Sequence, residues 1–328
     1  MKCTNSIRHN LFLIISIVFS ICFLTGCGSK SFRIPYDADS TVVAYGFDSY
    51  CTEATAKPFA ADLCVAASDI SLQSADLSLA SAAGLFDITD HETLYAKSVN
   101  RSLHPASLTK TMTAYLALKY GKTDDVLTAS ENVELSESGA QMCGFKPGDQ
   151  LTLDQVLHGL LLYSGNDAGI MIAEYISGSV DEFARLMNKE ARELGATNTN
   201  FVNPHGLTDE NHYTTAYDLY LIFQAAMQYD RFKEIIHTAD YTSTYTDAQG
   251  NTKDIHYSTT NQYLSGGVKA PQNVTVIGGK TGTTKAAGNC LILLSNNASG
   301  ASYISIVMQT DDKDALYGQM NNLLKMIP

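Results

Sequence analysis

A serine and a lysine lie three positions apart in the segment HPASLTK, at Ser107 and Lys110. Side chains at i and i+3 of a helix share one face and lie about 5–6 Å apart. A serine at a helix N-terminus also lies beside free backbone N–H groups, which can stabilise a developing oxyanion. A lysine kept neutral by burial and a like-charged neighbour can remove the hydroxyl proton. The pair predicts a serine nucleophile with a lysine base, and the alternative is a helix-capping serine beside a solvated lysine.

A like-charged neighbour for Lys110 is available in the K-T-G motif, which occurs once, at residues 280–282. The segment VTVIGGKTG predicts a strand, and its glycines indicate that another backbone approaches closely. A strand of small residues at a sheet edge can pair with an extended peptide. Lys280 and Thr281 would then present a cation and a hydroxyl to a carboxylate. The alternative is a tight turn that carries a surface lysine.

A third candidate is the S-x-N pattern at Ser164 and Asn166. The pattern alone has little specificity, because it also begins at Ser98, Ser130 and Ser295. Ser164 differs from these because it closes a strongly apolar helix and is followed by another helix start. Polar groups at such a buried junction require partners. We therefore expect Ser164 and Asn166 to belong to the same site as the other two motifs.

The elements that must position these motifs follow from hydrophobic periodicity. Residues 81–88 and 93–97 predict a β-hairpin, and the chain after it becomes helical. We expect helices over residues 106–120, 152–163, 167–176, 181–194 and 216–228, strands over 274–282, 290–295 and 303–309, and a last helix over 314–326. Gly121 lies where a residue just beyond a helix belongs, and Thr152 or Asp154 can cap the second helix. Strands at both chain ends around a helical middle predict an α+β fold.

The N-terminus predicts export. Lys2 and Arg8 precede the apolar run LFLIISIVFSICFL, which is shorter than the roughly 20 residues of a membrane span and typical of a signal peptide. The following LTGC resembles a bacterial lipobox, in which the cysteine is lipidated and becomes the mature N-terminus. We expect a lipoprotein signal peptide over residues 1–26, a lipidated Cys27 with a tether over 27–75, and a catalytic domain over 76–328. The predicted location is extracytoplasmic and lipid-anchored to the membrane, and the alternative is an ordinary signal peptide.

Composition narrows the possible partners. The formal charge of −12 argues against nucleic acid, and 45% hydrophobic with 17% charged residues indicates a folded protein. Four cysteines follow Cys27, and their spacing fits no zinc site, which leaves a local Cys51–Cys64 disulfide or buried thiols open. His205 and His212 lack a third ligand at suitable spacing, so we expect them to be structural and predict no metal.

Taken together, the blocks PASLTKTMTAY, LLLYSGNDA, FVNPHGL and GGKTGTTKAAG resemble the D-alanyl-D-alanine carboxypeptidases of the low-molecular-weight penicillin-binding proteins, serine peptidase family S11. The resemblance covers about residues 81–309. It implies the fold shared by serine β-lactamases and DD-peptidases, in which an antiparallel sheet is built from both chain ends and a helical subdomain lies in the middle.

The resemblance also implies an activity. The enzyme would remove the terminal D-alanine from peptidoglycan stem pentapeptides through an acyl-enzyme, bind penicillin and other β-lactams, and serve cell wall biogenesis and cell shape without a cofactor. The implied partners are the stem peptide, β-lactam inhibitors and the membrane that holds the lipid. The implied roles are nucleophile for Ser107, general base for Lys110, proton relay for Ser164, substrate amide contact for Asn166, and carboxylate binding for Lys280, Thr281, Gly282 and Thr283, with the backbone N–H groups of Ser107 and Thr283 as the oxyanion hole.

One feature departs from the family pattern. The basic residue that helps to bind the terminal carboxylate in some members has no clear counterpart after Gln309, where Asp311, Asp312 and Lys313 stand. Two alternatives remain: a β-lactamase of the same fold, although no E-x-x-L-N segment follows Asn166, and a catalytically silent peptidoglycan-binding lipoprotein, which the intact motif residues disfavour.

Overall fold

The computed structural model describes residues 62–70, 76–137 and 139–328. All described residues belong to one compact unit, residues 58–328. The predicted signal peptide, Cys27 and Cys51 lie outside the described residues. Within the described ranges, no helix has the length and apolar character that crossing a membrane requires.

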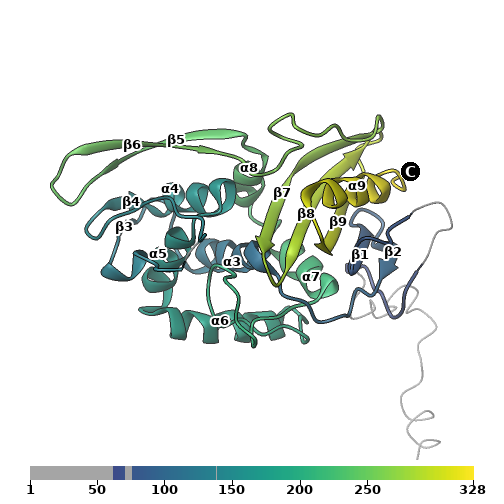
Figure 1. Cartoon of the computed structure of the whole chain (residues 1–328), viewed down its shortest axis with the longest axis horizontal. Helices are drawn as coiled ribbons and strands as arrows, with labels where there is room; N and C mark the ends of the chain where they lie inside the picture. The colour runs from purple at the N-terminus through teal and green to yellow at the C-terminus, as the bar shows by residue number, and fades with distance from the viewer. Residues whose placement is uncertain (1–61, 71–75, 138) are drawn as a thin grey trace, which may run out of the picture. The chain divides into compact units, whose positions relative to one another are not determined.

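An antiparallel sheet of five strands joins the two ends of the described chain, in the order β2-β1-β9-β8-β7 (Figure 1). Its first and last parts meet where β1 pairs with β9, with Ala82 opposite Met308. This confirms the predicted sheet built from both chain ends, and it leaves β7 on an edge. The strands are β1 (Ala82–Asp87), β2 (Glu92–Lys97), β7 (Val274–Thr284), β8 (Gly288–Asn297) and β9 (Ser302–Thr310).

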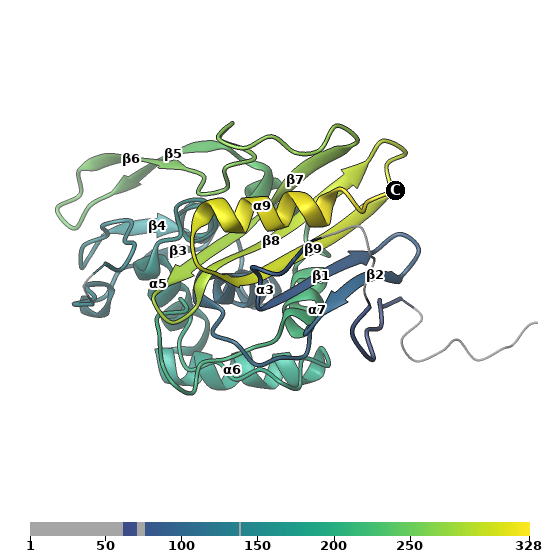
Figure 2. The same cartoon turned by 45° about the vertical axis from the view of Figure 1, so that its right-hand side comes forward.

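Helices cover both faces of this sheet. Figure 2 shows α9 (Lys313–Leu324) across one face, with α3 (Lys110–Tyr120) and α7 (Ala216–Ala226) behind the other. Successive residues of a strand point to opposite faces, so Leu291 of β8 packs in the core under α9, and Ile292 packs in the core that α3 and α7 share. The β8 strand is therefore apolar without alternation, as expected for a strand buried on both sides.

The middle of the chain holds the remaining helices, as the sequence predicted. They pack around α3 and α5. Their bounds are η1 (Ala106–Thr109), η2 (Glu131–Val133), α4 (Leu153–His158), η3 (Gly159–Tyr163), α5 (Asn166–Ser177), α6 (Val180–Glu193) and α8 (Asp230–His237).

A second sheet, in the order β3-β4-β5-β6, was not predicted. Its strands are β3 (Val126–Thr128), β4 (Gln150–Thr152), β5 (Asp240–Thr246) and β6 (Thr252–Ser258). β3 and β4 are only three residues long, and β5 and β6 form a long hairpin (Figure 1). This hairpin is mostly exposed and has few apolar side chains. Sequences of this kind lack the buried face on which a strand prediction depends.

Two helix boundaries differ from the sequence prediction. The helix expected over residues 106–120 starts with the separate 3₁₀ turn η1, so α3 begins only at Lys110, whereas its predicted end before Gly121 is confirmed. A Cβ at Gly121 would lie 2.8 Å from the Ala117 carbonyl oxygen. The helix expected over residues 152–163 begins at Thr152, which forms a capping box with Gln155, but it changes at Gly159 into a π-helical turn. That turn ends at Ser164, a site residue.

Candidate active site

The turn that carries Ser107 has a strained start. Ala106 has φ +48°, a left-handed conformation that is uncommon for a residue with a side chain. The carbonyl of Ala106 accepts the Thr109 hydroxyl at 2.8 Å, and Thr109 Oγ1 lies 2.8 Å from His212 Nε2. His212 Nδ1 accepts the Val202 N–H at 3.2 Å, so Nε2 is the protonated nitrogen and donates to Thr109. His212 therefore stabilises the strained turn, as its predicted structural role requires.

Lys110 begins α3 and is fully buried. Its Nζ lies 2.9 Å from Ser107 Oγ, 2.6 Å from Asn166 Oδ1 and 2.7 Å from the His205 carbonyl oxygen. The predicted contact between Ser107 and Lys110 is therefore present, and Asn166 of the second motif joins it.

The pKa of Lys110 lies well below its usual value. Burial is the larger cause, and the charge of Lys280 is the next. These are the two causes that the sequence predicted for a neutral base. Lys280 is also buried, and the pKa of its amine falls to about 7 through desolvation. Burial thus disfavours the charged form of both amines, and the charge of Lys280 lowers the pKa of Lys110 further.

The second motif owes its geometry to the turn between η3 and α5. Ser164 has the left-handed conformation φ +69°, and the next residue but one, Asn166, starts α5. Both side chains are almost fully buried. Ser164 Oγ accepts a hydrogen bond of 2.9 Å from Lys280 Nζ, which connects the second motif to the third.

The K-T-G strand passes directly against the nucleophile turn. A Cβ on Gly282 would lie 3.0 Å from the Pro105 carbonyl oxygen and 3.1 Å from the Ser107 amide nitrogen. Because these neighbours are backbone atoms, a side chain at residue 282 would push the strand away from Ser107. The sequence expectation that glycine marks a close backbone approach is confirmed at this position.

The threonines of this strand have partners that the sequence did not indicate. Thr281 Oγ1 lies 2.6 Å from Thr260 Oγ1, and Thr283 Oγ1 donates to Asn289 Oδ1 at 3.0 Å. The amide of Asn289 donates to the carbonyls of Thr310 and Asp311, which fixes its oxygen toward Thr283. The proton of the Thr283 hydroxyl is therefore already used in this hydrogen bond.

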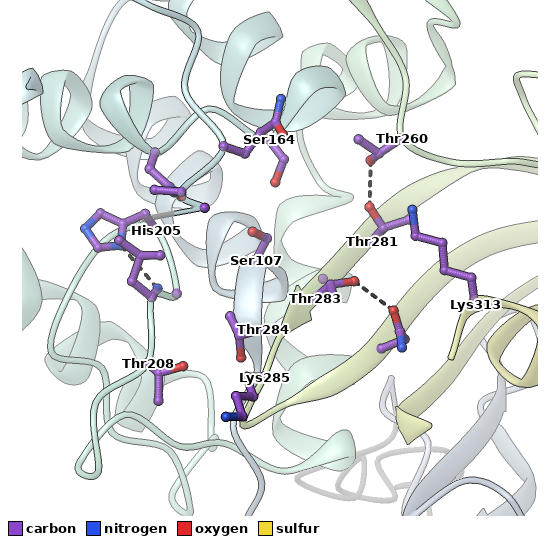
Figure 3. Close-up of a pocket in the computed structure, with 18 of the residues that line it drawn as sticks. Ser107, Ser164, His205, Thr208, Thr260, Thr281, Thr283, Thr284, Lys285 and Lys313 are labelled. Carbon is purple, nitrogen blue, oxygen red and sulfur yellow. Dashed lines mark hydrogen bonds between the residues drawn. The ribbon is translucent and has the colours of Figure 1, made fainter. Parts of the chain in front are cut away.

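A cavity of about 490 Å³, a size typical of small-molecule sites, is lined by Ser107, Ser164, Asn166 and residues 281–283. Figure 3 shows Ser107 and Ser164 on one side and the threonines of β7 on the other. Two exposed lysines also line it, Lys285 and Lys313. The Lys313 side chain extends toward Thr281, whereas Lys285 points away from Thr281 (Figure 3). No motif marked these lysines, because helix α9 and the turn after β7 reach the cavity only through the tertiary fold.

Other candidates have structural roles. His205 lines the cavity, and burial lowers its pKa to about 3 and that of His212 to about 4. Among the described residues, no group of histidine, cysteine and carboxylate side chains is arranged to hold a metal ion. Cys64, Cys143 and Cys290 are buried free thiols, and Cys51 lies outside the described residues.

The central helices lie between two halves of one antiparallel sheet, and the serine is hydrogen-bonded to a buried lysine. This combination is typical of the penicillin-recognising serine proteins. The sequence profile of the D-alanyl-D-alanine carboxypeptidase family, peptidase family S11, matches residues 71–312. The chain therefore belongs to this family. The resemblance stated from its motifs is confirmed.

Individual relatives agree with this assignment. The chain is 41% identical over 175 residues to D-alanyl-D-alanine carboxypeptidase DacF of Bacillus subtilis, which covers 51% of this chain and 42% of that one. It is 32% identical over 249 residues to DacC of Escherichia coli, covering 73% and 59%. The chain thus spans about half the length of the curated relatives it matches. The crystal structure of the Streptomyces K15 DD-transpeptidase superposes with a TM-score of 0.70 at 26% identity, over 76% of this chain and 96% of that one.

Proposed function

We propose that this protein is a serine D-Ala-D-Ala carboxypeptidase that removes the terminal D-alanine from peptidoglycan stem peptides. The observation that carries the proposal is the surroundings of the Lys110 amine. Its neighbours Asn166 Oδ1 and the His205 carbonyl oxygen only accept hydrogen bonds. A neutral amine gives its two protons to these oxygens and turns its lone pair toward Ser107 Oγ, the third neighbour.

Acylation follows from that arrangement. Ser107 Oγ attacks the carbonyl carbon of the last peptide bond while its proton passes to the lone pair of Lys110. The backbone N–H groups of Ser107 and Thr283 stabilise the oxyanion. The Ser164 hydroxyl gives its proton to the departing nitrogen and takes another from Lys280, from which it accepts a hydrogen bond.

Deacylation returns both lysines to their starting states. Water attacks the acyl-enzyme, and its proton passes through Ser164 to Lys280. Lys110 gives its proton back to Ser107 Oγ as the ester bond breaks. The products are free D-alanine and the shortened peptide, with no proton gained or lost by the protein.

Substrate orientation comes from the edge strand and the outer part of the cavity. Strand β7 lies at the sheet edge, so an extended peptide can pair with it. We assign the cation that faces the terminal carboxylate to Lys313, because it extends toward Thr281 in the cavity (Figure 3). This assignment fills the place for which the sequence offered no clear counterpart.

The protein is proposed to act outside the cytoplasm, anchored by lipid on Cys27. The support is the apolar run that follows Lys2 and Arg8 and ends in LTGC. A Cys27→Ala variant should leave the membrane fraction and lose labelling by a radioactive fatty acid. Retention of both in the variant would count against the lipid anchor.

Intact-protein mass spectrometry after addition of penicillin tests the activity, together with D-alanine release from a stem pentapeptide. The wild type should gain the mass of one penicillin and release D-alanine, and Ser107→Ala should do neither. No mass gain in the wild type contradicts the mechanism. Rapid penicillin turnover without peptide cleavage identifies a β-lactamase instead. A folded wild type that binds peptidoglycan without any acylation identifies a silent binding module.

A further inference from the structure

Asp167, next to Asn166, is fully buried and is not used by the mechanism above. Its carboxylate accepts four backbone N–H groups. Oδ1 accepts Cys143 at 2.9 Å and Ala168 at 3.0 Å, and Oδ2 accepts Gly144 at 2.7 Å and Phe145 at 3.2 Å. Only an acceptor with two oxygens satisfies donors on both sides. Three of these donors belong to the segment 143–145, which lies between η2 and β4 and is part of no helix or strand.

This segment is continuous with one wall of the cavity. Gly139, Ala140 and Gln141 line the cavity, and the Gln141 carbonyl accepts the Asn166 N–H at 2.8 Å. The bonds from residues 143–145 to Asp167 and from Asn166 to Gln141 hold the wall against the turn of the second motif. The wall and the Ser164–Asn166 turn therefore cannot move independently.

The contact at Gly165 is too close to admit any larger residue. A Cβ there would lie 2.3 Å from Cys143 Sγ and 2.8 Å from Asp167 Oδ1. The thiol of Cys143 stays protonated, since burial raises its pKa well above the usual value. Asp167 thus provides the negative charge at this junction, beside a site that contains the two buried amines Lys110 and Lys280.

We infer that Asp167 is a positioning residue with two effects: it ties the 139–145 wall to the Ser164–Asn166 turn, and its charge balances the single ammonium shared by Lys110 and Lys280. One carboxylate beside two amines makes the buried site neutral when one amine is protonated and the other is free. That is the protonation state that the base requires, so the inference rests on the proposed function.

The groups that face Lys110 come from four parts of the fold. Lys280 on β7 lowers its pKa, whereas Asp167 on α5 raises it. Cys143, in the segment before β4, is neutral, and His205, in the loop before α7, is neutral because its pKa falls to about 3. Removal of the Asp167 charge should therefore lower the pKa of Lys110 further.

The experiment measures the rate of acylation by a fluorescent penicillin against pH for Asp167→Asn. The acid limb of the profile, which reports deprotonation of Lys110, should move to lower pH by about half to one unit. The maximal rate should also fall at least about tenfold, because an amide cannot accept all four N–H groups and the wall loosens. A purely structural residue would lower the rate without moving the limb.

Asp149→Asn is the matched control. Asp149 is also a buried carboxylate near the same segment, and it accepts the Lys146 N–H at 2.9 Å, but it does not act on Lys110. Its acid limb should stay in place. If Asp167→Asn behaves like this control, the inference is wrong. If the wild type is not acylated at all, the proposed function fails instead.

Hydrogen exchange of the wild type gives a second test that does not depend on a folded variant. The amides of residues 143–145 should exchange at least about a hundredfold more slowly than those of the exposed turn at residues 248–250, because the buried carboxylate holds them. Equal exchange in the two segments would contradict the inference that Asp167 ties the 139–145 wall to the Ser164–Asn166 turn.

Discussion

Four lysines surround the cavity in the described part of the chain, and they form two contrasting pairs. Lys110 and Lys280 lie beneath its floor, almost without solvent exposure, and each contacts a motif serine. Lys285 and Lys313 lie at its rim, exposed to water. Burial lowers the pKa values of Lys110 and Lys280, whereas the side chains of the other pair are in contact with water.

The contrast assigns chemistry to the floor and recognition to the rim. A buried amine can change its proton affinity through a single neighbour, as the effect of Lys280 on Lys110 shows. A solvated amine is screened and keeps its charge, so it can attract a carboxylate but cannot accept a proton at neutral pH. Changes at the floor should therefore alter rates and pH profiles, whereas changes at the rim should alter substrate binding.

The largest expected effect is at the floor. Lys110→Ala should acylate about 10²- to 10⁴-fold more slowly than wild type, since it removes the general base. Stopped-flow measurement with a fluorescent penicillin gives the rate, and circular dichroism checks that the variant folds. If a folded Lys110→Ala variant is acylated at nearly the wild-type rate, the assignment of the chemistry to the buried lysines is wrong.

The burial of two histidines near the floor lysines should also make the stability of the protein sensitive to acid. His205 and His212 are neutral when folded, with pKa values of about 3 and about 4, but titrate near 6.5 when unfolded. The unfolded state therefore binds more protons as pH falls below about 6.5, and stability should fall by about 1.4 kcal/mol per pH unit for each histidine.

Urea unfolding between pH 7 and pH 4.5 measures this slope. His212→Gln should reduce it, whereas the same change at the exposed His237 should leave it unaltered. An unchanged slope in the His212 variant would show that the acid sensitivity arises elsewhere.

The pH dependence of the acylation rate should distinguish the role of Lys280 from that of Lys110. Lys280→Met removes the positive neighbour of Lys110, so the pKa of Lys110 rises and the acid limb of acylation should move to higher pH by about one unit. This direction is opposite to that expected for Asp167→Asn. If both variants shifted the limb in the same direction, the electrostatic account of the floor would be wrong.

The smallest effect is expected at the rim. Lys313→Ala should raise the KM for a stem pentapeptide about three- to tenfold with little change in kcat, and high salt should weaken the difference. Lys285→Ala is the matched control, since its side chain points away from Thr281, and it should change KM less (Figure 3). If the two substitutions raise KM equally, Lys313 has no specific role in binding the terminal carboxylate.

The sequence predicted the floor better than the rim for a physical reason. Ser107 and Lys110 are joined by local helix geometry, and Lys280 stands in a motif with close-packed glycines, so short stretches of sequence contain the information. Lys313 and Asn289 reach the cavity only because α9 and β8 begin there, which no local pattern specifies. Asp167 lies in the first turn of α5, and only the fold brings residues 143–145 to its carboxylate.

The same reasoning explains the elements. The sheet of β1, β2, β7, β8 and β9 and the longer central helices have apolar faces and were predicted within a few residues, whereas the short helix α8 was not predicted. The β5–β6 hairpin has alternating polar side chains and little burial, and β4 contributes a single pairing to it, Gln150 opposite Thr246. Its position depends on contacts between distant segments, which periodicity does not reveal.

The closure of the main sheet by β1 and β9 has a consequence for folding. Ser107 follows the first strands and Lys280 lies in the last part of the chain, so the two meet only after the sheet has formed from both ends. Contacts between such distant segments form late and cooperatively. An active but partly unfolded intermediate is therefore not expected, and the loss of penicillin acylation during denaturation should coincide with global unfolding. Acylation competence can then serve as a quantitative probe of the native population.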